Sequence, residues 1–277
     1  MPRVRPFLLS LPERLQIAVI IGATVTAAFA VAVATRALFD VNQLVANIGL
    51  TTAVYEVLGT IYAILLAFVV SGIWQNFSGA VASVQAEAGA LLGLIHIVDA
   101  FPSEQSKQVR SVAYTYAMEV IAEWQVLAGV ARGAIQPTDL SYEATVALIR
   151  AVQFLEPVNA RETAVFEQAL IVLNAWLDAR RKRLQSAGGG SAAALWPLLL
   201  AGAIVLFAFH GLFVARSIEV WSALLLGLSS VVGLAFYLIF SLDSPFTGSL
   251  SAHVGPFQWV VISCQREMPR RPSEPEA

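Results

Sequence analysis

Four long runs of apolar residues dominate this sequence and limit the folds that are open to it. The first run, residues 17–34, contains no charged residue. A helix of about 20 such residues crosses the roughly 30 Å hydrocarbon layer of a bilayer. The other runs occupy residues 57–74, about 192–215 and about 218–240. Together they predict an all-α, polytopic membrane protein with four transmembrane helices and a helical cytoplasmic domain between helices 2 and 3.

The overall composition agrees with a lipid environment. Hydrophobic residues make up 57% of the chain and charged residues 13%, whereas about 25% of the residues of a soluble domain are charged. The net charge of −2 provides no basic surface for nucleic-acid phosphates, so we expect no nucleic-acid partner. Cys264 is the single cysteine, which excludes an intrachain disulfide.

No catalytic or cofactor motif stands out in the sequence. The three histidines, His96, His210 and His253, lie far apart, and the spacings typical of zinc, calcium, dinucleotide or serine-nucleophile sites do not occur. We therefore expect no metal, no cofactor and no enzymatic activity. His210 falls inside the third apolar run, where we expect a neutral imidazole bonded to a neighbouring helix. A functional intramembrane histidine is the alternative.

Breaks in the apolar pattern divide the chain into four segments. They are an N-terminal transmembrane hairpin (1–74), a cytoplasmic helical domain (75–191), a C-terminal transmembrane hairpin (192–241) and a cytoplasmic C-terminal segment (242–277). Apolar residues continue beyond Trp74 at spacings of three and four, so the second helix is expected to run on into the cytoplasmic domain until Pro102.

Three further helices are expected in the cytoplasmic domain. The first begins at Ser103, the second covers about 138–155, and the third opens at Asn159, where Glu162 follows at a capping-box spacing. Residues 188–191, Gly-Gly-Gly-Ser, are expected to form a hinge. Residues 242–248 and 255–259 are predicted to be irregular, and the tail from Met268 to be disordered.

The positive charges predict the orientation in the membrane. With the N-terminus inside, 15 of the 17 Lys and Arg residues lie on the inner side, and only Arg36 and Arg216 lie outside. The middle domain and both termini should therefore be cytoplasmic, in a multi-pass protein of the bacterial inner membrane. The basic cluster Arg180, Arg181, Lys182 and Arg183 is interpreted as a topology signal that contacts anionic membrane lipids. A specific ligand site is the alternative.

The first apolar run has a second interpretation as a secretory signal peptide. Arg3 and Arg5 precede it, and Ala32-Val33-Ala34 is similar to a cleavage site. The run is longer than the 7–15 residues of an ordinary signal core, which favours a membrane span.

One face of the second helix is a candidate ion path. Small and weakly polar residues recur there at spacings of three and four: Glu56, Thr60, Ala63, Ala67, Ser71 and Gln75. Bulky residues lie on another face: Ile61, Leu65, Phe68, Val69 and Ile73. Bulky apolar side chains face lipid at no cost, whereas small ones suit a water-filled path or a helix-packing seam, and both alternatives stay open. Glu56 is either a solvated interfacial carboxylate or part of an acidic ring at a pore mouth.

Two blocks of sequence carry a family resemblance. The first comprises residues 59–74 and 84–88, and the second comprises residues 243–248 and 255–257. In this order they resemble the bestrophin-like family of bacteria, whose own function is unknown and which is distantly similar to the bestrophin channels. The likeness in layout covers nearly the whole chain.

The resemblance implies four spans, cytoplasmic termini, a helical cytoplasmic domain and a symmetric homo-oligomer, a pentamer by analogy, with a central pore lined by the second helix. It therefore implies an ion channel. In calcium-gated bestrophins an acidic run follows the last span, and here only Asp243 stands in that region, so calcium gating is not expected. The second helix lacks a uniformly bulky apolar neck, so anion selectivity is not carried over. A stator-type energy-coupling complex and a non-conducting signalling scaffold are the alternative functions.

Overall fold

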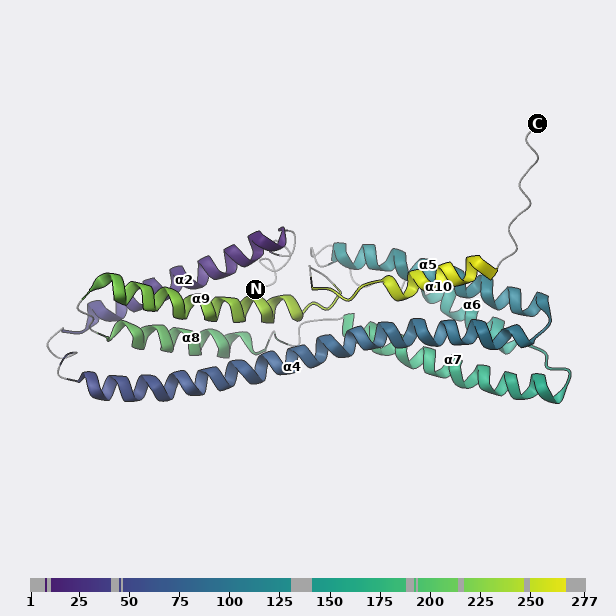
Figure 1. Ribbon diagram of the computed structural model, residues 1–277, viewed down its shortest axis with the longest axis horizontal. Helices are drawn as coiled ribbons and strands as arrows, with labels where there is room; N and C mark the ends of the chain where they lie inside the picture. Colours follow the sequence, from purple (N-terminus) through teal and green to yellow (C-terminus); the bar gives the residue numbers. More distant parts are fainter. Residues whose placement is uncertain are drawn as a thin grey trace, which may run out of the picture. The chain divides into compact units, whose positions relative to one another are not determined.

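The computed structural model describes residues 8, 11–40, 45, 47–130, 141–187, 192, 194–213, 217–246 and 250–267. Within these residues all regular structure is helical (Figure 1). The elements in chain order are α2 (Glu13–Leu38), α4 (Ile48–Ile97), the short 3₁₀ helix η1 (Val98–Ala100), α5 (Ser103–Val130), α6 (Tyr142–Gln153), α7 (Ala160–Ala187), α8 (Trp196–Gly211), α9 (Ile218–Leu242) and α10 (Gly255–Glu267). The all-α class predicted from the sequence is confirmed.

The helices form two compact units. Unit 1 comprises α2, α8, α9 and the part of α4 that ends at Phe77. Unit 2 comprises the rest of α4 from Ser78, together with η1, α5, α6, α7 and α10. Because α4 is one uninterrupted helix of 50 residues, it contributes to both units, as the continuation of the apolar pattern beyond Trp74 predicted.

Glycines bring the helices of unit 1 into close contact. A Cβ atom added at Gly233 of α9 would lie 3.1 Å from the Cα of Ile21 on α2, and one added at Gly211 of α8 would overlap the backbone carbonyl of Ala32. Small residues permit this approach, which is typical of helices packed in lipid. Helix α2 is thus packed closely against α8 and α9 in unit 1.

Among the described residues three helices, α2, α4 and α9, are long and apolar enough to cross a membrane. Helix α8 is also apolar but has only 16 residues, which corresponds to a length of about 24 Å. The sequence predicted a longer third span over residues 192–215. The difference arises because the helix starts only at Trp196, with Pro197 in its first turn, and ends at Gly211. The structure therefore supports three spans by length, and the prediction of a fourth is not confirmed.

A contiguous apolar core holds unit 2 together. Leu91 and Leu94 of α4, Tyr116 of α5, Leu148 of α6 and Trp176 of α7 are all fully buried in it. Burial of side chains of this size stabilises the unit by about 1.5–3 kcal/mol each. The core explains why helices that are polar on their outer faces assemble around α4.

The prediction of an irregular chain over residues 255–259 is wrong. These residues begin α10, whose Phe257, Val260 and Cys264 are fully buried in the core of unit 2. The Gly-Pro pair suggested a loop, but Pro256 lies in the first turn of the helix, where its missing N–H is not needed. The expected hinge at 188–191 and the tail from Met268 lie outside the described residues.

The Asn159 cap predicted at the start of α7 is present, and the return bond from Glu162 goes to Val158, one residue before the cap. The N–H of Glu162 donates to Oδ1 of Asn159 at 2.9 Å, and Oε2 of Glu162 accepts from the N–H of Val158 at 2.9 Å. One open N–H of the first turn of α7 and the N–H of Val158 just before the cap are thereby satisfied.

Replacing Asn159 by alanine should lower the free energy of unfolding of unit 2 by about 1 kcal/mol, because the cap is lost. The matched control is Asn174→Ala in the same helix. Asn174 is exposed and donates only to the carbonyl of Leu170, one turn back, and alanine is the better helix former. Thermal unfolding of the purified protein should therefore shift downwards for the first variant only. Equal shifts would show that the cap contributes nothing.

Candidate functional site

The six residues of the candidate path lie on one exposed face of α4 in unit 1. Glu56, Thr60, Ala63, Ala67, Ser71 and Gln75 are all exposed, and we call this set the α4 stripe. Its polar groups bond along the helix: Oγ1 of Thr60 donates to the carbonyl of Glu56 at 2.8 Å, and Nε2 of Gln75 donates to Oγ of Ser71 at 3.4 Å. The stripe is therefore small, weakly polar and turned away from the core of its own unit.

The opposite side of α4 packs inside unit 1. Tyr62, Val69 and Ile73 are only 3–7% exposed, and the hydroxyl of Tyr62 donates to the carbonyl of Leu199 on α8 at 3.0 Å. Gly202 permits this contact, since a Cβ there would lie 2.6 Å from the Tyr62 ring. The side of α4 that bears the stripe is thus the side without a partner in the unit.

The bulky face expected to meet lipid is divided in the structure. Ile61 and Phe68 are 59% and 75% exposed, as a lipid-facing role requires, whereas Val69 and Ile73 are buried. The expectation of a single lipid-facing bulky surface is therefore wrong for these two residues. The bulky residues of α4 therefore have two roles. Ile61 and Phe68 lie at the surface of unit 1, and Val69 and Ile73 pack in its core.

His210 packs within unit 1. Its Nε2 lies 3.4 Å from the carbonyl oxygen of Trp221 on α9, and the indole N–H of Trp221 donates to the carbonyl of His210 at 3.4 Å. The rings of Tyr55 and Phe213 lie 6.3 and 6.2 Å away. The contact with a neighbouring helix expected from the sequence is present.

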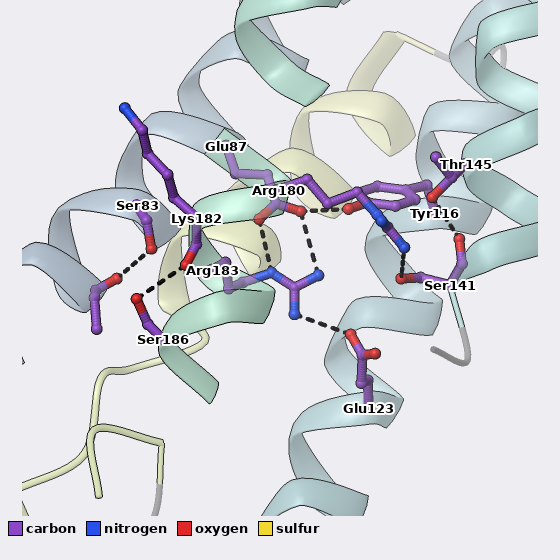
Figure 2. Close-up of polar contacts among 11 residues, drawn as sticks. Ser83, Glu87, Tyr116, Glu123, Ser141, Thr145, Arg180, Lys182, Arg183 and Ser186 are labelled. Atoms are coloured by element: carbon purple, nitrogen blue, oxygen red, sulfur yellow. Dashed lines mark hydrogen bonds and ion pairs between the residues drawn. The ribbon is translucent and has the colours of Figure 1, made fainter. Parts of the chain in front are cut away.

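A buried cluster of charged residues occupies the middle of unit 2 (Figure 2). Arg183 of α7 pairs with Glu87 of α4 through Nε at 2.7 Å, and with Glu123 of α5 through Nη1 at 2.9 Å. The hydroxyl of Tyr116, also on α5, donates to Glu87. The side chains of Arg183 and Glu87 are 1% and 0% exposed. The guanidinium of Arg183 thus links α4, α5 and α7 through charge-assisted hydrogen bonds, which are stronger than those between neutral groups.

Two aromatic rings and the opposite charges of the carboxylates stabilise the positive charge of Arg183. The guanidinium carbon of Arg183 lies 5.9 Å from the ring centroid of Trp124 and 6.0 Å from that of Phe257 on α10, within cation–π range. Burial alone would lower the pKa of Arg183, but its carboxylate partners hold that pKa above the ordinary value. Burial, and then the charge of Glu87, raises the pKa of Tyr116 well above its ordinary value, so the phenol remains a donor.

The basic cluster read from the sequence is divided by the fold. Arg180 and Arg183 are 9% and 0% exposed, so their charges face the interior of unit 2 and not a lipid surface. Arg180 approaches the hydroxyl of Ser141 at 3.4 Å. Arg181 is exposed and pairs with Asp178, and the side chain of Lys182 points away from the buried cluster in Figure 2. Any lipid contact of this segment falls to Arg181 and Lys182.

Sequence reasoning missed the buried cluster, although one signal was present. Glu87 lies three residues after Val84 and four before Leu91, on the apolar face of α4. A carboxylate at a core-facing position needs a buried cation, and this requirement pointed to an arginine elsewhere in the cytoplasmic segment. Glu123 gave no comparable signal, because nothing local distinguishes it from an exposed glutamate.

The fold defines an α-helical membrane protein in which the longest of the described helices, α4, exposes the small, weakly polar α4 stripe. The bestrophin-like domain family matches residues 22–257. The chain therefore belongs to the bestrophin-like family, as the sequence blocks indicated. Searches of curated proteins and of solved structures give no significant match.

Proposed function

We propose that this protein is an oligomeric ion channel whose path is lined by the α4 stripe. The observation that carries the proposal is the division of α4: all six stripe residues are exposed, while Tyr62, Val69 and Ile73 on the other side are buried. Membership of the bestrophin-like family supports an assembly with a central path. In a bilayer, an exposed face of small and polar groups is best placed along water or against another helix.

A single subunit has too few helices to enclose an aqueous path, so the proposal requires a homo-oligomer. We propose a closed ring of identical subunits, a pentamer by analogy with bestrophins. In this arrangement α8 acts as a short fourth span, because its contacts with α2 and with Tyr62 keep it inside the helical bundle. Unit 2 and both termini face the cytoplasm, with 15 of the 17 positive residues on that side.

Cysteine scanning tests the assignment of the path. Cys264, buried in unit 2, is first replaced by alanine, and single cysteines are then introduced at Thr60, Ala67 and Ser71. We expect a membrane-impermeant thiol reagent to label these positions and to block current, because water reaches them through the path.

The controls for this scan distinguish a path from mere exposure. Ile61 and Phe68 are exposed too, but cysteines at these positions should resist the reagent, because they would face lipid. A cysteine at Ile73 should resist it because the position is buried. If Ile61 and Phe68 react while Thr60 and Ala67 stay protected, the stripe is a packing seam and the path lies elsewhere.

Reconstitution into planar bilayers separates the channel from its alternatives. Ohmic currents from the purified oligomer support a channel. A protein that stays silent under all ionic conditions but binds a membrane partner would instead be a scaffold, and transport coupled strictly to protons would indicate a stator-type complex.

A further inference from the structure

The ionisable residues of α4 are few and unbalanced in charge. The helix contains no Lys or Arg in 50 residues, and its carboxylates and histidine are Glu56, Glu87 and His96. Glu87 is fully buried and bonded to Arg183, so its charge is compensated inside unit 2. His96 is exposed, and its Nδ1 lies 2.8 Å from the carbonyl of Leu92. Glu56 is therefore the only fixed charge of the α4 stripe.

The carboxylate of Glu56 is exposed, and no residue in the described part of the chain forms an ion pair with it. Its helix begins at Ile48, two turns earlier, and the positive potential of a helix N-terminus fades within the first turn. The dipole of α4 therefore does not cancel the negative charge of Glu56.

Arg36, in the last turn of α2, makes its described contacts with α9 and with the chain after α8. Arg36 of α2 lies with its guanidinium carbon 5.7 Å from the ring centroid of Trp221, and its Nη1 approaches the carbonyl of Phe213 at 3.4 Å. Glu219, in the first turn of α9 at the same end, is also acidic and exposed. Arg36 and Glu219 carry opposite charges, so the charge that the α4 stripe itself contributes is that of Glu56.

We infer that the path conducts cations in preference to anions and that Glu56 sets this preference. The inference rests on the proposed function, because it takes the α4 stripe as the wall of the path. In a symmetric ring each subunit places one Glu56 carboxylate at the same level of the path. Rings of Asp or Glu select cations, and walls of low dielectric constant focus such a potential and concentrate counter-ions.

The test is the reversal potential of the reconstituted full-length protein under a KCl gradient. For the wild-type protein, the reversal potential of the current should lie closer to the K⁺ equilibrium potential than to that of Cl⁻. Glu56→Gln, which keeps the side-chain volume but removes the charge, should lower the ratio of K⁺ to Cl⁻ permeability by about tenfold. Glu56→Asp keeps the charge and should remain close to the wild type. Glu219→Gln is the matched control for an acid at the same end but on another helix, and it should leave the ratio unchanged.

Salt dependence separates an electrostatic role from a structural one. The screening length is about 30 Å at 0.01 M salt and about 3 Å at 1 M. Conductance of the wild type and Glu56→Gln should therefore differ severalfold at low salt and converge at high salt. Currents with anion preference, or a cation preference that survives in Glu56→Gln, would overturn the inference while the channel itself stands. Complete absence of current would overturn the proposed function and the inference together.

Discussion

Replacing Arg183 by methionine is expected to lower the free energy of unfolding of unit 2 by about 3–5 kcal/mol, the range found when one partner of a buried ion pair is removed. Methionine fills a similar volume but leaves the carboxylates of Glu87 and Glu123 buried without their cation. The contacts of the guanidinium with Trp124 and Phe257 are lost as well. Hydrogen exchange of the amides of α5 and α7 should accelerate accordingly, because exchange of core amides reports the opening of the unit.

Two further variants make this result specific to the buried cluster. Arg181→Met removes an arginine two residues earlier on the same helix, but its side chain is 69% exposed, so stability should change by no more than about 0.5 kcal/mol. Adding Glu87→Gln to Arg183→Met removes one uncompensated carboxylate and should recover part of the loss. If Arg183→Met and Arg181→Met unfold alike, the buried ion pairs do not hold the unit together.

Replacing Gly211 by alanine should disrupt the contact between α8 and α2. The new Cβ would overlap the backbone carbonyl of Ala32, and backbone atoms cannot rotate away as a flexible side chain does. Overpacking of this kind costs about 1–3 kcal/mol. The midpoint of thermal unfolding of the detergent-solubilised protein should fall, and the helices of unit 1 should become more accessible to protease.

Gly22→Ala in α2 is the matched control for this prediction. A Cβ at Gly22 meets no atom within 4 Å, so alanine should be neutral or should stabilise the helix by up to about 1 kcal/mol through its better helix propensity. A loss of stability of the same size in both variants would contradict the role assigned to the close approach at Gly211.

Features set by local sequence were the ones that could be predicted. The apolar runs gave the long helices, the spacing beyond Trp74 gave the continuous α4, and the Asn159 and Glu162 pair gave the start of α7. In each of these the determining residues lie within one or two helical turns of each other. The α4 stripe belongs to this group too, because helical periodicity alone places its six residues on one face.

Features that depend on distant partners were not predictable from one sequence. Glu87 and Arg183 are 96 positions apart, and a run of four basic residues is equally typical of an exposed lipid contact. Val69 and Ile73 are residue types that also face lipid, and only their packing in the core of unit 1 shows that they are buried. The close approach of Gly211 to Ala32 on α2 is likewise a tertiary property that local sequence does not reveal.

The path of the chain through unit 2 sets an order for its biogenesis. Residues from Ser78 to the end of α7 are synthesised long before Phe257 and Cys264, yet these late residues fill the same core, and α8 and α9 lie between them in the sequence. Unit 2 therefore cannot finish folding until α10 has left the ribosome. A polypeptide in which α10 does not reach this core would leave Arg183 without Phe257 and expose an apolar surface, which is the signal that chaperones and proteases recognise.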